Sequence, residues 1–293
     1  MSRDRRSPHK PFESHLIEDF LDGRDILSIQ LLRDGKSNTN YKLILGDGQT
    51  CVLRLYSNGR PEREAYIMDL VRHIVPVPAE IARGDSWTVF SYMEGDLLRN
   101  VPEHSAAAAE ALARIHSIGF DSVGWIAADG TVSPFCFGGG NDFVATMLKH
   151  PDVLAWIGPD RADAVWEIWE REATRRAPLG DECCLVHGDF NPTNILIRDG
   201  EVSGILDWEF AHANTPYMDI GNLLRNTDPA YHGRVRAGLV AGGMDLPDDW
   251  VERAELIDLG SHLEFLTTNR LDAFKRQCVA RVDGFIRRFS GEL

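Results

Sequence analysis

The segment from His187 to Asn194 and the two runs after it constrain the fold of this 293-residue chain more than any other stretch. Residues 194–197 and the run from Val202 to Leu206 are mostly apolar, and the dipeptide Asp199-Gly200 between them is typical of a tight turn. The two runs are therefore predicted to pair as a β-hairpin. Such a hairpin would bring Asp207, at its end, close to the polar segment that precedes it.

Three side chains of this region, those of Asp189, Asn194 and Asp207, are expected near one point. Their chemistry suits phosphoryl transfer to a hydroxyl group. One carboxylate can accept the proton of the hydroxyl, while the other carboxylate and the amide hold Mg²⁺ against a triphosphate. A polar loop followed by an ordinary hairpin is the alternative, and the complete ordered set of residues argues against it.

The spacing of these residues resembles the catalytic loop and the metal-binding Asp of protein kinases. The form found here, His-Gly-Asp-Phe-Asn-Pro-Thr-Asn at 187–194 with Asp-Trp-Glu at 207–209, is similar to the aminoglycoside phosphotransferase and choline kinase family. This resemblance implies that Asp189 is the general base, that Asn194 and Asp207 bind Mg²⁺, and that His187 braces the loop. Asp219 is predicted to cap the next helix or to brace the catalytic loop.

The resemblance covers about residues 26–224 and implies an α+β, two-lobed, protein-kinase-like fold. Residues 1–94 would form a small N-terminal, nucleotide-binding lobe of antiparallel sheet plus one helix, and residues 95–293 a larger, mainly helical lobe for catalysis and substrate binding. Local patterns predict strands at 26–32, 41–45, 50–56, 79–83 and 87–93, and a helix at 61–74. Three more helices are predicted after residue 229.

Arg54 is a cation inside an apolar strand, where an unpaired charge is costly. Protein kinases have a Lys there that binds the α- and β-phosphates, and the resemblance implies that Arg54 takes this role, with a planar fork suited to phosphate oxygens. Glu64 shares one stripe of the following helix with apolar residues, so it is the expected counter-ion of Arg54. The alternatives are an Arg54 that extends into solvent from an edge strand and a solvent-exposed Glu64.

The turn at residues 34–40 resembles the loop that covers the nucleotide phosphates in small-molecule kinases. Gly35 would allow close approach of the backbone, and Ser37, Asn38 and Thr39 would add hydrogen-bond donors. The Gly-x-Gly-x-x-Gly pattern of protein kinases is absent, and an ordinary hairpin turn is the alternative.

The segment Tyr92-Met93-Glu94-Gly95 resembles the hinge between kinase lobes. Backbone groups bind the purine edge at such a hinge, so the side chains do not separate ATP from GTP. Val52, two residues before Arg54, would lie over the base.

The net charge of −14 argues against a nucleic-acid partner and favours cationic substrates by electrostatic steering. Two acids of the C-terminal helices, Asp258 and Glu264, could line a pocket for such a substrate, although solvated helix faces are the favoured interpretation. No apolar run is long enough to cross a membrane and no secretory signal is visible, so a cytoplasmic location is expected. The five cysteines are expected to be reduced thiols. Nothing in the sequence indicates the oligomeric state.

These features together predict a small-molecule kinase that transfers the γ-phosphoryl group of ATP or GTP, with Mg²⁺, to a hydroxyl. The acceptor stays open among an aminoglycoside or other antibiotic, a choline-like amine, a sugar and a metabolite such as homoserine. One rival is an inactive, nucleotide-binding pseudokinase that acts as an interaction module, but the complete trio argues against it. Another is a metal-dependent hydrolase, which would leave Arg54 and Glu64 without a purpose.

Overall fold

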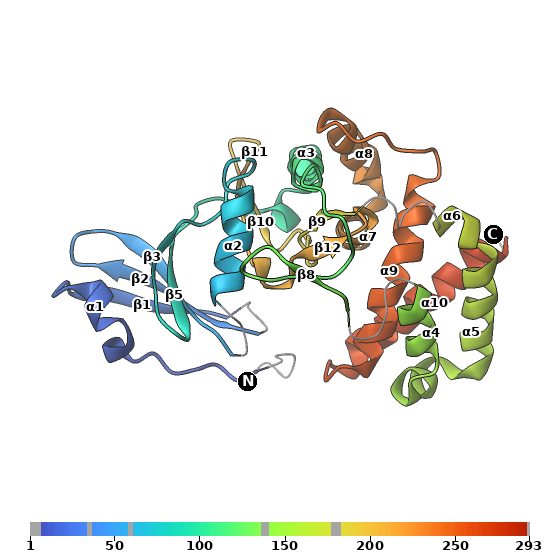
Figure 1. Ribbon diagram of the computed structural model, residues 1–293, viewed down its shortest axis with the longest axis horizontal. Coiled ribbons are helices and arrows are strands. Elements are labelled where there is room, and N and C mark those ends of the chain that lie inside the picture. Colours follow the sequence, from blue (N-terminus) through green and yellow to red (C-terminus); the bar gives the residue numbers. More distant parts are fainter. Residues whose placement is uncertain (1–6, 34–36, 58–60, 136–140, 177–182, 292–293) are drawn as a thin grey trace.

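The computed structural model describes residues 7–33, 37–57, 61–135, 141–176 and 183–291 (Figure 1). Its N-terminal part is a five-stranded antiparallel sheet with the order β1-β2-β3-β5-β4. The strands are β1 (Ile26–Leu32), β2 (Thr39–Leu45), β3 (Thr50–Leu55), β4 (Glu80–Arg83) and β5 (Trp87–Ser91), preceded by η1 (Ser14–Ile17) and α1 (Glu18–Leu21). All five predicted strands are present, with small shifts at their ends.

Side chains alternate across this sheet, which gives it one apolar face and one polar face. Leu43 of β2 and Leu53 of β3 belong to a buried cluster that also includes Ile17 of the N-terminal segment. On the opposite face of β3 lie Val52 and Arg54, as the alternation predicted, and they pair in register with Lys42 and Asn40 of β2. This second face is turned toward α2 and the C-terminal part, because Arg54 contacts Glu64 and Asp207.

Helix α2 (Pro61–Val71) follows β3 in the chain and packs against the C-terminal part. Pro61 fits the first turn because its missing N–H would have no helical partner there. Glu64, Ile67, Met68 and Val71 are buried along one stripe, as predicted. The three apolar residues belong to the large cluster that includes Phe90 of β5 and the core of the C-terminal helices, and they do not join the cluster under the sheet. The boundary between residues 94 and 95 stays a prediction.

The C-terminal part is mainly helical. Its helices are α3 (Ser105–His116), α4 (Asn141–Leu148), α5 (Pro151–Arg171), α6 (Ala173–Arg176), α7 (Tyr217–Arg225), α8 (His232–Ala241), α9 (Trp250–Thr267) and α10 (Asp272–Ser290), with short 3-10 turns η2 (Leu98–Asn100), η3 (Pro102–His104), η5 (Trp208–Phe210) and η6 (Pro229–Tyr231). The three α-helices predicted after residue 229 are therefore confirmed. Helices α4, α5, α9 and α10 share a separate buried cluster.

Small sheets between these helices carry the predicted catalytic segments. The hairpin of β10 (Ile195–Arg198) and β11 (Glu201–Ile205) is present, and β10 also pairs with β6 (Asp96–Leu97), directly after the hinge. At its tip Asp199 and Gly200 have φ values of 54° and 86°, the left-handed pair typical of a two-residue hairpin turn. Two further pairs are β9 (Cys184–Val186) with β12 (His212–Asn214) and β7 (Trp125–Ile126) with β8 (Val132–Ser133).

Two general properties complete the description. No helix in the described ranges has both the length and the apolar character needed to cross a lipid bilayer. Cys51, Cys183, Cys184 and Cys278 form no disulfide, which agrees with the expectation for these four cysteines.

Candidate active site

The loop after β9 is held by the side chain of His187, which is completely buried. Its Nε2 lies 2.9 Å from the carbonyl oxygen of Leu206, and its Nδ1 lies 3.2 Å from the backbone N of Asp189. Because a carbonyl only accepts and an N–H only donates, this imidazole carries its proton on Nε2 and is neutral. His187 therefore joins the loop to the residue before Asp207, and the structure places it as a brace, in agreement with the expectation.

Asp219 supports the same loop by accepting hydrogen bonds from its backbone. Its carboxylate accepts hydrogen bonds from the backbone N of His187 at 2.7 Å and of Gly188 at 2.9 Å, and it contacts Nε2 of His116 at 3.2 Å. The contact with His116 and the loop N–H groups hold the pKa of Asp219 below its ordinary value, although burial opposes this. Asp219 lies within α7, after the N-cap Pro216, so of the two predicted roles the structure shows the brace.

The side chain of Asp189 is oriented by two amides. Nδ2 of Asn191 donates to one carboxylate oxygen at 2.9 Å, and Nδ2 of Asn194 donates to the other at 3.0 Å. The backbone oxygen of Asn194 accepts from the N of Leu206 at 2.8 Å, which places Asp207 next to this group. The three predicted side chains therefore come from adjoining backbone segments. The role of Asn191 was not predicted, although its position inside the motif was a signal.

Asp207 connects the loop to the N-terminal sheet. Its backbone is left-handed, with φ 70° and ψ 59°, and its Oδ1 lies 3.1 Å from a guanidinium nitrogen of Arg54. Arg54 also pairs with Glu64 of α2 and donates to Asn40 Oδ1 at 3.1 Å. This buried arginine thus has the predicted counter-ion, and neither solvent-exposed alternative holds. Although burial alone would lower it, the carboxylates of Glu64 and Asp207 raise the pKa of Arg54 above its ordinary value.

Residues 28–256 match the model of the phosphotransferase enzyme family, abbreviated APH. The chain belongs to this family. The suspected relationship and the prediction of a phosphotransferase are thereby confirmed at the level of the family.

Proteins similar in sequence to this chain include homoserine kinases and members of the acyl-CoA dehydrogenase family. A homoserine kinase of Methylobacillus flagellatus is 27% identical in an alignment 222 residues long that covers 70% of this chain and 66% of that protein. Acyl-CoA dehydrogenase family member 11 of Gallus gallus is 28% identical in an alignment 220 residues long that covers 66% of this chain and 27% of that protein. The chain thus matches only part of the length of both relatives.

Solved structures of the family share the fold. Macrolide 2′-phosphotransferase MphH from Brachybacterium faecium superposes with a TM-score of 0.66 at 16% identity, over 95% of this chain and 98% of that one. A thermostable mutant of aminoglycoside phosphotransferase APH(4)-Ia, in ternary complex with AMP-PNP and hygromycin B, gives a TM-score of 0.66 at 20% identity, over 94% and 97% of the two chains. The predicted α+β, two-lobed, kinase-like fold is confirmed.

Glu209, two residues after Asp207, is a site residue of this phosphotransferase-family chain that was not predicted. Its Oε2 accepts from Nδ2 of Asn38 at 2.8 Å, a contact between the loop before β2 and the segment after Asp207. Burial and the neighbouring charge of Asp207 raise the pKa of Glu209 to about 7. Its place in the Asp-Trp-Glu segment was the only available signal, because the contact joins residues 171 positions apart.

The loop residues predicted to contact the nucleotide have different surroundings. Gly35 lies outside the described residues. Asn38 is buried and its Oδ1 accepts from the N of Ser57 at 3.1 Å, while the backbone oxygen of Ser37 accepts from Ser57 Oγ at 2.9 Å. Thr39 is fully buried, and its hydroxyl accepts from the N of Lys10 at 3.0 Å. The prediction for Thr39 is wrong, because β2 begins at this residue and its alternation turns the side chain to the face opposite Arg54.

The hinge residues lie between β5 and β6. Tyr92 is 36% exposed, and the ammonium of Lys42 lies over its ring, 3.8 Å from the centroid. Met93 lies against Gly204 of β11, since a Cβ added to that glycine would be 3.2 Å from the terminal methyl of Met93. Val52 is half-buried and pairs with Phe90 of β5 in register. Tyr92, Met93 and Val52 therefore all belong to the region where β3, β5 and the hinge meet.

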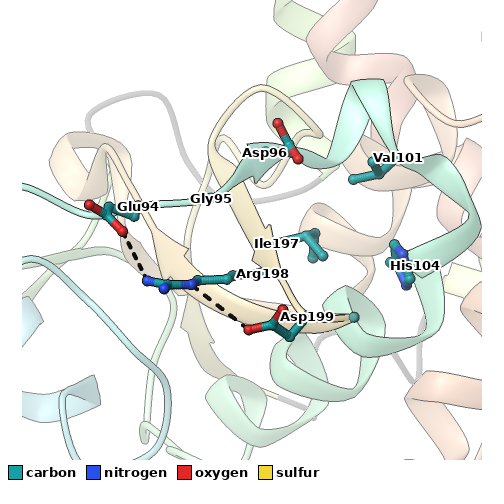
Figure 2. A pocket seen from close by; sticks show the side chains of 9 residues that line it. Glu94, Gly95, Asp96, Val101, His104, Ile197, Arg198 and Asp199 are labelled. Atoms are coloured by element: carbon teal, nitrogen blue, oxygen red, sulfur yellow. Dashed lines mark hydrogen bonds and ion pairs between the residues drawn. The ribbon is translucent and has the colours of Figure 1, made fainter.

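An open hollow of about 500 Å³ lies beside the hinge, at the tip of the β10–β11 hairpin (Figure 2). Three of its charged side chains are paired: Arg198 contacts Glu94 at 2.9 Å and Asp199 at 3.8 Å. Of the predicted site residues, none lines this hollow. The loop around Asp189 is therefore the candidate active site, rather than this surface.

The donor atoms around Asp189 fit a magnesium ion. Asn194 uses its Nδ2 to bind Asp189, so its amide oxygen is the atom that remains for a cation, and only one oxygen of Asp207 is paired with Arg54. Amide and carboxylate oxygens are the ligands that Mg²⁺ prefers. In the described ranges no group of three His, Cys, Asp or Glu side chains is arranged to hold a metal, so the multi-ligand cluster expected of a metal-dependent hydrolase is not among them.

The two acids proposed for a cationic substrate differ from each other. Glu264 is exposed. Asp258 is buried and pairs with Arg225, so its assignment to a solvated helix face is wrong. The reason is that α7 covers this side of α9, which the sequence of α9 alone does not reveal.

Proposed function

We propose that this chain is a small-molecule kinase that transfers the γ-phosphoryl group of ATP or GTP to a hydroxyl group. The observation that carries the proposal is the orientation of the Asp189 carboxylate by Asn191 and Asn194, next to the Asp207–Arg54–Glu64 chain. A carboxylate held in this way is positioned to accept a proton, while the guanidinium opposite it is positioned to bind phosphate oxygens.

In the proposed reaction, Asp189 accepts the proton of the acceptor hydroxyl as the hydroxyl oxygen forms a bond to the γ-phosphorus. The bond between that phosphorus and the bridging oxygen breaks, and the nucleoside diphosphate leaves. Arg54 compensates the charge on the phosphates, and Glu64 keeps its guanidinium in place. When bound, Mg²⁺ on Asn194 and Asp207 would neutralise phosphate charge. Most of the rate acceleration would then come from orientation and charge compensation.

The proposed nucleotide site lies on the polar face of the sheet. Val52 and the hinge residues Tyr92 and Met93 would contact the base, and Ser37 and Asn38 would shape the loop near the phosphates. The neighbours solved with AMP-PNP and with ATP support a nucleoside triphosphate as donor. A comparison of turnover with ATP and with GTP would determine which nucleotide is preferred.

A phosphorylation screen tests the function directly. Purified protein is incubated with Mg²⁺ and either ATP or GTP over a panel of hydroxyl compounds that begins with homoserine and includes aminoglycosides, macrolides, choline and sugars. The names of the sequence relatives and of the solved neighbours justify this order. Turnover on at least one compound is expected. Nucleotide binding without turnover on any compound would instead favour the pseudokinase.

The Asp189→Asn variant tests the assignment of the base. Its turnover is expected to fall by about 10²–10⁴-fold while nucleotide affinity is retained, since only the proton acceptor is lost. The matched control is Asp199→Asn, which removes a carboxylate from the exposed tip of the adjoining hairpin and should leave turnover unchanged. Wild-type rates in Asp189→Asn would refute the assignment.

A further inference from the structure

A cavity of about 390 Å³ lies between α7, α9 and α10, and α8 contributes His232 to its wall. Its lining includes none of the residues assigned above to phosphoryl transfer. The cavity has a size typical of sites for small organic molecules. Its position matters for the active site because α7 also carries Asp219, which holds the catalytic loop.

Cationic side chains outnumber anionic ones around this cavity, although the whole chain carries a net charge of −14. Arg225, Arg281 and Arg288 are in its wall, opposed by the carboxylates of Asp258 and Glu255. The local surplus of positive charge is the reverse of what a cationic substrate would require. Asp258, a candidate for binding a cationic substrate, is thus paired with Arg225 within the cavity wall.

Two of the three arginines in the cavity wall form ion pairs with its carboxylates, and the third does not. Arg225 pairs with Asp258, and Arg288 lies 2.8 Å from Glu255. Arg281 donates to the backbone oxygen of Arg225 at 3.1 Å and makes no ion pair within the described part of the chain. Partial desolvation and the charge of Arg225 lower the pKa of Arg281, whereas the carboxylate of Asp258 opposes this, and Arg281 itself is exposed.

Two imidazole nitrogens of the same wall are also unsatisfied. Nε2 of His262 lies 3.2 Å from Asp258 Oδ2 and so carries a proton, whereas its Nδ1 is buried with no hydrogen-bond partner among the described residues. Nε2 of His232 is likewise buried without a partner there. Buried polar atoms without partners are uncommon and costly. Because Nε2 of His262 carries the proton, Nδ1 of the neutral ring is a hydrogen-bond acceptor and would need a donor, so the anion-binding groups of this wall are its arginines.

The rest of the wall is apolar, with Leu224, Val251, Leu259 and Phe285 among its residues. An occupant that matches both parts has an apolar body and one anionic group. We propose that this cavity binds the carboxylate or phosphate group of a small organic anion through Arg281 and Arg288. The inference goes beyond the proposed function, because it requires binding and no turnover.

The anionic group has two chemical sources: the phosphoryl acceptor itself or a separate effector. Both are compatible with the position of the cavity. Arg225 follows Asp219 by six residues on α7, which is about 9 Å along a helix axis. The cavity thus adjoins the helix that carries Asp219.

Calorimetric titration of the full chain tests the proposal with three probes of similar shape: phenyl phosphate, benzoate and benzylamine. Saturating Mg²⁺ and ADP is present throughout to occupy the nucleotide site. Phenyl phosphate and benzoate are expected to bind and benzylamine is not. In Arg281→Gln the affinity for phenyl phosphate should fall by about tenfold, as expected when one charge-assisted contact is lost.

The matched control is Arg287→Gln, an exposed arginine on the same helix that does not line the cavity. It should bind phenyl phosphate like the wild type, and both variants should retain the wild-type melting temperature. Equal losses in the two variants, binding of benzylamine as tight as that of phenyl phosphate, or no binding of either anion would overturn the proposal.

A final arm separates the two sources once the screen has found an acceptor. If phenyl phosphate competes with that acceptor, the cavity holds the acceptor's own anionic group. If it binds without competition, the cavity holds a separate ligand. Either result supports the site, and neither bears on whether Asp189 is the base.

Discussion

Asp219 remains charged although it is completely buried, because two backbone N–H groups and His116 surround its carboxylate. A pKa below the ordinary value means that its contribution to stability is present above the unfolded pKa of about 3.9 and is lost as the pH falls through the folded pKa. In Asp219→Asn we expect a melting temperature lower by about 5 °C or more at pH 7. The loss of stability toward acid should also be shallower than in the wild type.

Thermal unfolding of both proteins between pH 3 and pH 8 measures this. Asp228→Asn serves as the control, since that aspartate is exposed and caps only a short turn. Identical pH dependence in Asp219→Asn and the wild type would contradict the assignment of the buried carboxylate.

Arg54 is the residue on which the nucleotide site most depends. It is 8% exposed and bonded to Glu64, Asp207 and Asn40 at once. Arg54→Ala is expected to weaken nucleotide binding by about 10–100-fold through loss of charge-assisted phosphate contacts. Titration with a fluorescent ATP analogue measures the change, with Arg83→Ala on exposed β4 as control. A variant that unfolds with no specific loss of nucleotide affinity would point to a purely structural arginine.

Single residues were predictable where a motif fixed them, and not where a partner came from a distant segment. The motif and its family resemblance singled out Asp189, Asn194 and Asp207, whose roles stay proposals. Strand alternation and the helical stripe pointed to the Arg54–Glu64 pair that the structure contains. Arg63 could not be found in this way, because it donates to backbone oxygens of Ile126, Glu209 and Ala211, atoms that every sequence contains.

Helices α3 and α8 pack at unusually close range. A Cβ added to Gly238 would lie 2.1 Å from the carbonyl oxygen of Ala106, so only glycine fits there. Gly238→Ala is expected to destabilise the protein by about 2 kcal/mol or more because backbone must move. Gly233→Ala on the same helix meets no atom within 4 Å and should stabilise by about 0.5–1 kcal/mol. Urea unfolding compares the two, and a Gly238→Ala protein as stable as Gly233→Ala would disprove the close contact.

Helices and strands were predictable because the residue patterns that define them are local in sequence. The packing of one element against another depends on distant segments and was not predictable. The start of β2 two residues before the predicted position was enough to turn Thr39 inward. The burial of Asp258 and the cavity beside it depend on how α7, α9 and α10 meet, and no single helix sequence contains that information.

The whole molecule should respond to its ligands as one cooperative unit. Binding to the folded state alone at 100 times Kd stabilises by about 2.7 kcal/mol, which is about 5–10 °C in melting temperature. We expect such a shift with Mg²⁺ and ATP, and a smaller one in Asp207→Ala. Differential scanning fluorimetry with Mg²⁺ alone, ATP alone and both gives the measurement. A wild-type protein whose melting temperature does not move would speak against nucleotide binding between the lobes.

Helix α2 contacts both the N-terminal sheet and the C-terminal core. Glu64 holds Arg54 of the sheet, while Ile67, Met68 and Val71 are sealed into the C-terminal core and Arg63 binds backbone oxygens there. Swinging the sheet outward to admit a nucleotide would leave α2 behind and separate Arg54 from Glu64. Opening would thus remove the contact that orients Arg54 for phosphate binding, and closure would restore it.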